Sequence, residues 1–379
     1  PVWAERERAA IQWGIDPIIA QVLHNRGIAD PDNARSFLDP KLTQLGEPED
    51  YVDLVPAART LAQAVRAGRR IAVYSDYDVD GVCGAAILWH VLHVAGADPV
   101  IYIPHRLEEG YGLKAAPVRK LAKAGAELLV TVDCGIRDDD VVAEARDLGL
   151  QVILTDHHEP NETFPPAHAV IHPARRSHGG APAHDLPCGA AVAFKLGWAL
   201  ARELSDGRRV RDDFRALLVE LTALAALATV ADVVPLVGEN RVLVKFGLDQ
   251  VARSRLVGLS ALLNSARLES TRVESFHVGF VLGPRLNAAG RMGHAREAFE
   301  LLTTSDPARA EELAEYLQKQ NRRRQRLEEE IFEQAVALAE AQGQTDDSVG
   351  AIVLAQADWH IGVIGIVASK LVDRYHRPV

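Results

Sequence analysis

Residues 70–81 read RIAVYSDYDVDG, a short apolar run followed at once by Asp76, Asp78 and Asp80. The run at 70–75 is rich in β-branched and aromatic residues and stands between helical patterns at 57–68 and 82–95, as a strand buried on both faces does. Similar runs at 99–104, 128–132 and 151–155 alternate with helical patterns at 113–124 and 138–148. Strands separated by helices of about ten to fifteen residues predict βαβ units and a parallel, doubly wound α/β sheet.

Acids and histidines also follow two of the other expected strands. Asp133 comes after the run at 128–132, and Asp156, His157 and His158 come after 151–155. The carboxyl ends of parallel strands share one edge of a sheet, where ligands bind, so these side chains are expected to converge, and Asp232, at the end of a buried run, can close the set. Taken alone, Asp133 is better explained as a turn or helix-cap residue. The alternating aspartates at 76–80 are harder to explain that way, because their mutual repulsion is costly without a cation.

The ligand types indicate which metals to expect. Carboxylate oxygens with imidazole nitrogen suit Mn²⁺ or Mg²⁺ better than the thiolate-rich sites of zinc do. The acids suffice for two ions, and two ions about 3.5–4 Å apart can bind a scissile phosphate, generate hydroxide and stabilise the leaving oxygen. The pattern therefore predicts phosphoryl hydrolysis, and it leaves DNA, a dinucleotide and pyrophosphate open as substrates.

Composition adds few restrictions. The chain has 379 residues, 48% of them hydrophobic, which allows two or three domains with a sizeable core. Three cysteines at no metal-ligand spacing favour a reduced, cytoplasmic setting. The net charge of −10 argues weakly against a nucleic-acid partner, although carboxylates around metals add to that count. No secretory signal is visible, and the apolar run at 216–231 is interrupted by Glu220 and too short for a bilayer, so no membrane association is expected.

The pattern along the chain predicts four segments. Residues 1–54 form a helical lead-in, in which Asp32 or Asn33 can cap a short helix, and 55–305 form the catalytic α/β domain. One long helix of about 54 Å spans 306–342, and its arginines at 322–324 are expected on a solvated face. Residues 343–379 begin a second α/β domain, with a strand at 351–355 and a helix at about 363–374.

These motifs, in this order, resemble those of the DHH phosphoesterase superfamily. The chain is most similar to the RecJ-like exonucleases, through the segments NRGI (25–28), PHRLEEGYGL (104–113), GPRLNAAGRM (283–292), 321–325 and GVIGIVAS (362–369). The resemblance covers nearly the whole chain. It implies hydrolysis of single-stranded DNA from the 5′ end with two Mn²⁺ (or Mg²⁺) ions, in DNA repair and recombination. It also implies a monomer that works with single-strand-binding protein and recombination helicases.

The resemblance also implies roles for individual residues. The implied metal ligands are Asp78, Asp80, Asp133, His157 and Asp232, with Asp133 as the bridge and Asp76 as a weaker ligand or a supporting group. His158 contacts the substrate phosphate or, alternatively, supports His157, and it joins Asp78, Asp80, Asp133 and His157 as catalytic. Arg106, Arg285 and Arg291 are implied to bind DNA phosphates, unless they are simply solvated or salt-bridged. Asn287 lies between two of them, and Tyr111 stacks on a base or packs in the core.

Part of the family pattern does not occur in these residues. A Ser/Arg phosphate loop and a Gly-Gly-His motif are expected beyond 362–369 and are not found, which puts substrate grip in doubt. Two alternatives stay open: a DHH enzyme for short oligonucleotides or cyclic dinucleotides, and a non-catalytic DNA-binding scaffold. The scaffold would not bind two Mn²⁺ ions tightly, whereas the enzymes would.

Overall fold

A five-stranded parallel sheet lies at the centre of the chain, in a computed structural model that describes residues 3–175, 186–205, 209–269 and 271–379. The strand order is β2-β1-β3-β4-β5. The strands are β1 Ile71–Ser75, β2 Val100–Tyr102, β3 Leu128–Val132, β4 Gln151–Thr155 and β5 Ala169–Ile171. The register pairs Ser75 with Val132 and Val132 with Thr155, so β1, β3 and β4 end at the same level.

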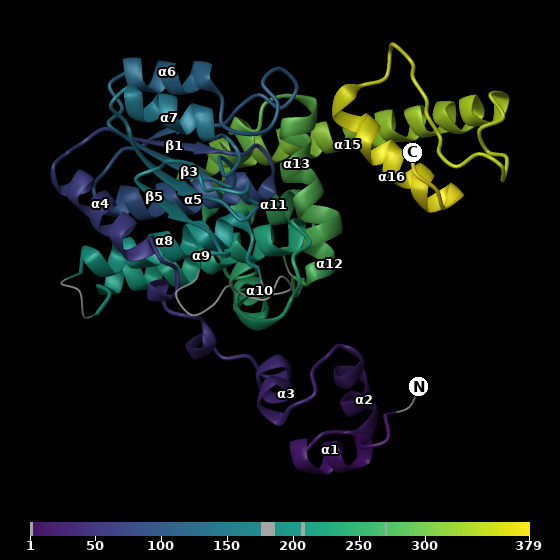
Figure 1. Cartoon of the computed structure of the whole chain (residues 1–379), viewed down its shortest axis with the longest axis horizontal. Helices are drawn as coiled ribbons and strands as arrows, with labels where there is room; N and C mark the ends of the chain where they lie inside the picture. The colour runs from purple at the N-terminus through teal and green to yellow at the C-terminus, as the bar shows by residue number, and fades with distance from the viewer. Residues whose placement is uncertain (1–2, 176–185, 206–208, 270) are drawn as a thin grey trace.

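Helices cover both faces of this sheet, which confirms the predicted doubly wound architecture (Figure 1). Two helices pack over the smaller of the two apolar cores and the others over the larger one. The smaller layer holds α6 Ala115–Lys123 and α7 Asp139–Asp147, and the larger holds α4 Leu54–Arg66, α5 Val79–Val94 and α8 Gly189–Glu203. The strands β1, β3, β4 and β5 are buried on both sides, because βαβ crossovers place helices on each face, whereas the edge strand β2 is partly exposed.

A second layer of helices packs outside α5 and α8. Its first members are α9 Asp212–Ala231, α10 Gly238–Val251 and α11 Val257–Ser265. The helix α9 is long and apolar enough to cross a membrane, yet it packs against α5, α8 and α10. Its apolar composition is therefore accounted for by burial in the protein core, as the sequence predicted.

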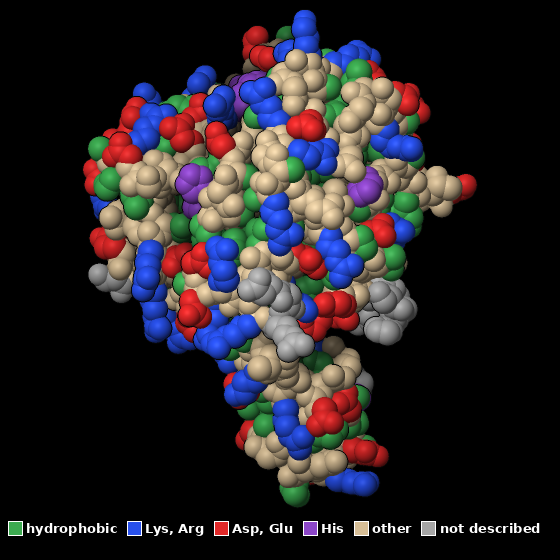
Figure 2. Space-filling view, turned by 90° about the vertical axis from the view of Figure 1, so that its left-hand side faces the viewer, with side chains coloured by type: hydrophobic (Ala, Val, Ile, Leu, Met, Phe, Trp, Pro, Cys, Tyr) green, Lys and Arg blue, Asp and Glu red, His purple; other side chains and the backbone are tan. Residues whose placement is uncertain are grey.

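The N-terminal residues form a small helical unit with a core of its own, which contains Trp13 and Leu23. Its helices are α1 Arg6–Trp13, α2 Pro17–Asn25 and α3 Pro31–Leu38, followed by two short 3₁₀ turns, η1 Leu42–Gln44 and η2 Pro48–Asp50. The cap of α3 is Asp30, not Asp32 or Asn33, because Pro31 occupies the first helical position and the Asp30 carboxylate accepts both following amides. Figure 2 shows the unit as a smaller lobe below the body, with basic and acidic side chains interspersed over the visible face.

A helical path leads from the body to the C-terminal end. It consists of α12 Ser275–His277, the π-helical turn η4 Val278–Leu282, α13 Gly283–Met292, α14 Arg296–Thr303 and α15 Pro307–Ala341. The helix α15 is the predicted long helix, and Asp306 caps it. Its outer half packs on α16 Ile361–Tyr375 through a separate apolar cluster that includes Ile331 and Val367.

Two expectations for this C-terminal part are wrong. Residues 351–355 do not form a strand; the Ile352 amide donates to the Pro378 carbonyl, but no neighbouring strand offers a ladder. The arginines at 322–324 do not all lie on a solvated face. Arg324 has only 13% of its side chain exposed and is held by Glu328 at 2.7 Å, which in turn binds Lys370 of α16 at 2.6 Å.

Candidate metal centre

Three aspartates follow directly from the aligned ends of the central strands. Asp76 comes after β1, Asp133 after β3 and Asp156 after β4, and the amide of each donates to the carbonyl of the last residue of the neighbouring strand. All three are buried, with at most 4% exposed. Asp133 has a φ of 61°, in the left-handed region that costs most residues about 1–2 kcal/mol. The sheet thus brings together the strand-end acids that the sequence predicted, and it holds one of them in a strained conformation.

The aspartates of the loop after β1 have different hydrogen-bond partners. Asp78 caps α5, where its Oδ1 accepts from the amides of Asp80 at 2.8 Å and Gly81 at 3.1 Å. Asn287 of α13 braces the same turn, because its Oδ1 accepts from the Val79 amide at 3.1 Å. Asn287 was expected to bind substrate, and the structure gives it a positioning contact that sequence reasoning did not predict.

The first turn of α8 binds Asp80. Both carboxylate oxygens accept backbone bonds there, from Gly189 at 2.6 Å and Ala190 at 2.7 Å. A Cβ on Gly189 would lie 2.6 Å from both Cβ and Oδ1 of Asp133, so only glycine fits at this point. Sequence reasoning missed this element. The available signal was a glycine at the start of an alanine-rich helix, directly after Pro187 and Cys188.

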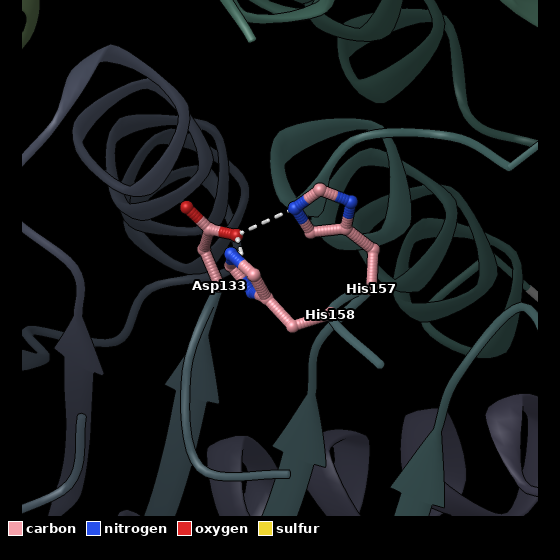
Figure 3. Close-up of side chains that lie close together, drawn as sticks. All are labelled: Asp133, His157 and His158. Carbon is pink, nitrogen blue, oxygen red and sulfur yellow. Dashed lines mark ion pairs between the residues drawn. The ribbon is translucent and has the colours of Figure 1, made fainter. Parts of the chain in front are cut away.

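His157 lies among acids from several elements, and Figure 3 shows its contact with Asp133. Its Nε2 lies 3.1 Å from Asp133 Oδ1, 3.6 Å from Asp80 Oδ2 and 3.7 Å from Asp232 Oδ2. The 3.1 Å contact lacks hydrogen-bond geometry, so His157 Nε2 and Asp133 Oδ1 are buried without a partner in the described chain, as is Asp76 Oδ1. Buried polar atoms that lack a partner are costly, and cations bound among them would supply the missing partners.

Two groups of side chains can each hold a metal ion. Asp76, Asp78 and Asp133 form one, and Asp80, His157 and Asp232 form the other, with the ligand atoms of each group within 4.8 Å of one another. Asp133 also groups with both histidines of the DHH motif, so it lies between the two sets. Oxygen ligands with one imidazole fit Mn²⁺ or Mg²⁺, so the residues present suit the predicted metals.

Burial and neighbouring negative charge raise the pKa of several carboxylates of this site. Burial and the charge of Asp78 raise the pKa of Asp76 to about 8. Burial and the charges of Asp80 and Asp78 raise the pKa of Asp232 to about 7, and the same causes raise the pKa of Asp133 well above its usual range. Burial lowers the pKa of His157, which keeps its imidazole neutral. Carboxylates that favour the protonated state in the absence of positive charge are typical of a site built to bind cations.

His158 is held by groups on either side of it. Its Nδ1 lies 2.8 Å from Asp156 Oδ1 and 2.9 Å from the hydroxyl oxygen of Tyr111, and that hydroxyl donates to the Asp133 carbonyl at 3.3 Å. Although burial opposes the charged form, the hydrogen bond and charge of Asp156 raise the pKa of His158. The Tyr111 ring is 43% exposed and is not a core residue, and its hydroxyl has a positioning contact that the sequence did not predict.

The predicted phosphate-binding arginines fall into two groups. Arg106 stacks on Tyr77, 4.8 Å from the ring centroid, and Arg291 donates to the Gly362 carbonyl of α16 at 3.1 Å. Burial and the charge of Arg106 lower the pKa of Arg291 to about 10, and the carboxylate of Asp78 opposes that shift, so both cations lie near the acidic loop. Arg285 instead donates to the Val281 carbonyl of its own helix path at 2.5 Å.

The sequence is similar to a family model and to curated proteins of the DHH family. A family model described as "DHH family, N-terminal domain" matches residues 70–229. The single-stranded-DNA-specific exonuclease RecJ of Bacillus subtilis is 38% identical over 367 residues, which cover 97% of this chain and 44% of that protein. The protein of the same name from Thermus thermophilus is 42% identical over 342 residues, covering 90% and 47%.

A solved structure shows the same similarity in three dimensions. The structure described as exonuclease RecJ bound to manganese matches with a TM-score of 0.77 and 40% identity, covering 89% of this chain and 80% of that one. The chain spans about half the length of the two curated relatives named above.

Proposed function

Because this chain belongs to the RecJ family of DHH proteins, we propose that it is a two-metal phosphodiesterase that hydrolyses single-stranded DNA from the 5′ end to 5′-mononucleotides. The observation that carries the proposal is the set of buried atoms without partners, on Asp76, Asp133 and His157, at the aligned ends of the central strands. The names of the relatives support the choice of substrate and polarity.

Metal ions at this site would supply charge to polarise the phosphodiester and lower the pKa of water. In the proposal, Asp76, Asp78 and Asp133 would hold one ion, and Asp80, His157 and Asp232 would hold the other. Asp133 would serve both sites, because its Oδ1 also lies 3.1 Å from His157 Nε2. Mn²⁺ or Mg²⁺ is the proposed occupant, since the ligands are oxygen-rich and contain no thiolate.

The residues around the ligands bind and orient the strand. His158 is charged more readily than an ordinary histidine, so it can stabilise negative charge that develops on a phosphate oxygen. Asp156 and Tyr111 keep its ring in place. Arg106 and Arg291 lie near the acidic loop and offer planar guanidinium groups to the phosphates on either side of the scissile bond.

Two residues that were predicted to bind substrate are proposed to act away from the scissile phosphate. Arg285 lies one helical turn after η4 and can bind a phosphate farther along the strand. Asn287 acts through the Val79 amide and keeps the acidic loop in the shape that its ligands require.

The test is degradation of single-stranded DNA that carries a label at either the 5′ or the 3′ end, with Mn²⁺ and with a duplex of the same sequence. The variant Asp133→Asn keeps the side chain's shape and tolerates the left-handed backbone, and Asp98→Asn, at an exposed position just before β2, is its matched control. We expect wild type and Asp98→Asn to release the 5′ label first, from the single strand only, and Asp133→Asn to release none.

Other outcomes contradict the proposal in different ways. Hydrolysis of dinucleotides without cleavage of long strands would assign the chain to the small-substrate enzymes of the superfamily. Tight DNA binding with no hydrolysis and no binding of two Mn²⁺ ions would assign it to the scaffold class. Early loss of the 3′ label would refute the polarity and leave the chemistry in place.

Some finer features belong to the same proposal. The enzyme acts as a monomer in the cytoplasm, where its three free, buried cysteines remain reduced. A helicase and single-strand-binding protein supply and hold the single strand. The proposed division of the chain is 1–54, 55–305, 306–342 and 343–379, with the active cleft between the second and last segments.

A further inference from the structure

A pocket of about 440 Å³ lies between the N-terminal helical unit and the start of α10. Its walls come from the turn after α2, from α3 and from residues 237–242. The turn after α2 contains Arg26, part of a motif in the sequence to which neither the fold nor the metal centre gives a role. The other cation that lines the pocket is Arg241, on the first turns of α10.

The two arginines converge on one aromatic ring. The guanidinium of Arg241 lies 3.7 Å from the ring centroid of Phe37, and that of Arg26 lies 6.0 Å from it. The Nε of Arg241 donates to the Phe37 carbonyl, which fixes the fork and leaves its terminal nitrogens available. Stacking on a ring face pre-organises a guanidinium for bidentate binding of an anion.

Neither arginine has a carboxylate partner among the residues that the structure describes. The nearby acids are bound elsewhere: Glu239 to the buried Lys195 at 2.6 Å, and Asp39 to Lys245 at 3.2 Å. Burial and the charge of Arg26 lower the pKa of Arg241, so the two cations repel each other. Two like charges that are held together without a counter-ion are stabilised when an anion binds between them.

The backbone adds to this preference. The helix α10 has 14 residues, and its N-cap, Val237, has no side chain that can accept from the first amides. The start of the helix forms part of the pocket wall, because Val237 and Gly238 line it. The N-terminus of a helix attracts anions through its dipole and its free amides, and here it acts together with two arginines.

We propose that this pocket binds a phosphate group of the single-stranded DNA outside the metal centre. Val237 follows Asp232 by five residues, so the two positions are at most about 18 Å apart, a distance that a short length of strand covers. This inference rests on the proposed function, because it names a second contact for the same substrate. The N-terminal unit then acts as one wall of the DNA path.

The test measures binding separately from cleavage. The affinity for a fluorescein-labelled oligothymidine is determined by anisotropy, without divalent metal, over a range of salt concentrations. Each contact to a single-strand phosphate contributes about 0.7 to the slope of log affinity against log salt. Arg26→Gln and Arg241→Gln should each lower the affinity and reduce the slope by about that amount. Arg35→Gln, an exposed arginine of α3 paired with Asp32, should keep the wild-type slope.

Two outcomes of these binding measurements would overturn the proposed phosphate site. If Arg241→Gln loosens the N-terminal unit, Arg26→Gln still decides, because its guanidinium has no backbone bond to lose. Wild-type affinity and slope in Arg26→Gln would overturn the site. A second outcome would also overturn it: Arg26→Gln binds inorganic phosphate or a mononucleotide more weakly than the wild type but keeps the wild-type salt slope for oligothymidine. The pocket would then bind free phosphate and not DNA.

The proposed function is checked apart from the pocket. A dinucleotide has one internucleotide phosphate, so it can occupy the metal centre without reaching the pocket. Suppose that the wild type hydrolyses neither this dinucleotide nor single-stranded DNA, while Arg26→Gln reduces the salt slope of DNA binding. That result would refute the proposed function and support the phosphate site.

Discussion

Replacing Gly189 by alanine tests the closest steric contact at the metal centre. The new Cβ would lie 2.6 Å from Cβ and Oδ1 of Asp133, whereas ordinary van der Waals contact begins at about 3.4 Å. Either Asp133 or the first turn of α8 must therefore move by about 0.8 Å, the difference between the two distances. A move of α8 would carry with it the two amides that bind Asp80.

The expected effects follow from that displacement. Overpacking of this size costs about 1–3 kcal/mol of unfolding free energy. A shift near 1 Å at a catalytic group can cost about 100-fold in rate. We therefore expect Gly189→Ala to remain folded, to bind Mn²⁺ more weakly, and to lose about two orders of magnitude in kcat.

The assays are urea unfolding, Mn²⁺ titration and single-turnover cleavage of single-stranded DNA. The control is Gly197→Ala, on the same helix two turns away, where the nearest atom is a methyl of Val91 at 3.2 Å. The control should keep activity and metal affinity, because small shifts of that methyl do not reach the site. Wild-type kcat and Mn²⁺ affinity in a folded Gly189→Ala protein would refute the reasoning.

Three further changes give independent tests. Asp76 has a pKa of about 8 when folded and about 3.8 when unfolded, so the metal-free protein should lose stability as pH rises between those values. Urea unfolding of the metal-free protein at about pH 5.5 and at about pH 8 should show this loss of unfolding free energy, and added Mn²⁺ should reverse it. An unfolding free energy that does not change with pH would contradict the raised pKa. Tyr111→Phe removes the hydroxyl beside His158, so kcat should fall about 10-fold with unchanged melting, as for other supporting groups. An unchanged kcat would remove Tyr111 from this role. Glu328→Gln leaves Arg324 without its partner in a site where both are mostly buried, and thermal or urea unfolding should show a loss of about 3 kcal/mol. A loss below about 1 kcal/mol, as for exposed pairs, would contradict the burial of this pair.

The sheet and its acidic edge were predictable because their signals are local. Each strand is a short apolar run, each run ends in an acid, and parallel strands bring their ends to one edge whatever lies between them. The residues at 76–80, Asp133 and 156–158 were therefore placed together correctly from sequence. Their assignment as metal ligands stays a prediction, supported by the buried atoms of Asp76, Asp133 and His157.

Features that depend on distant contacts were not predictable in this way. The bond from the Gly189 amide to Asp80 joins residues 109 positions apart, and no periodicity marks it. The strand β5 has three residues, too few to produce a pattern. The segment at 351–355 has the composition of a strand, but a strand exists only beside another one, and its neighbourhood provides none. Arg324 was expected on a solvated face, because its burial depends on tertiary contacts with α16 that no local pattern reveals.

Because α15 is long, a small bend in it produces a large displacement of its outer end. From Asn321, buried against the body, to the end of the helix at Ala341 is about 30 Å of rigid rod. A bend of only about 10°, within the gentle curvature that long helices commonly show, would move the outer end by about 5 Å. The bond from Arg291 to the Gly362 carbonyl joins α13 to α16 and opposes such a movement. The position of α16 beside Arg291 therefore depends on the straightness of α15 as well as on this hydrogen bond.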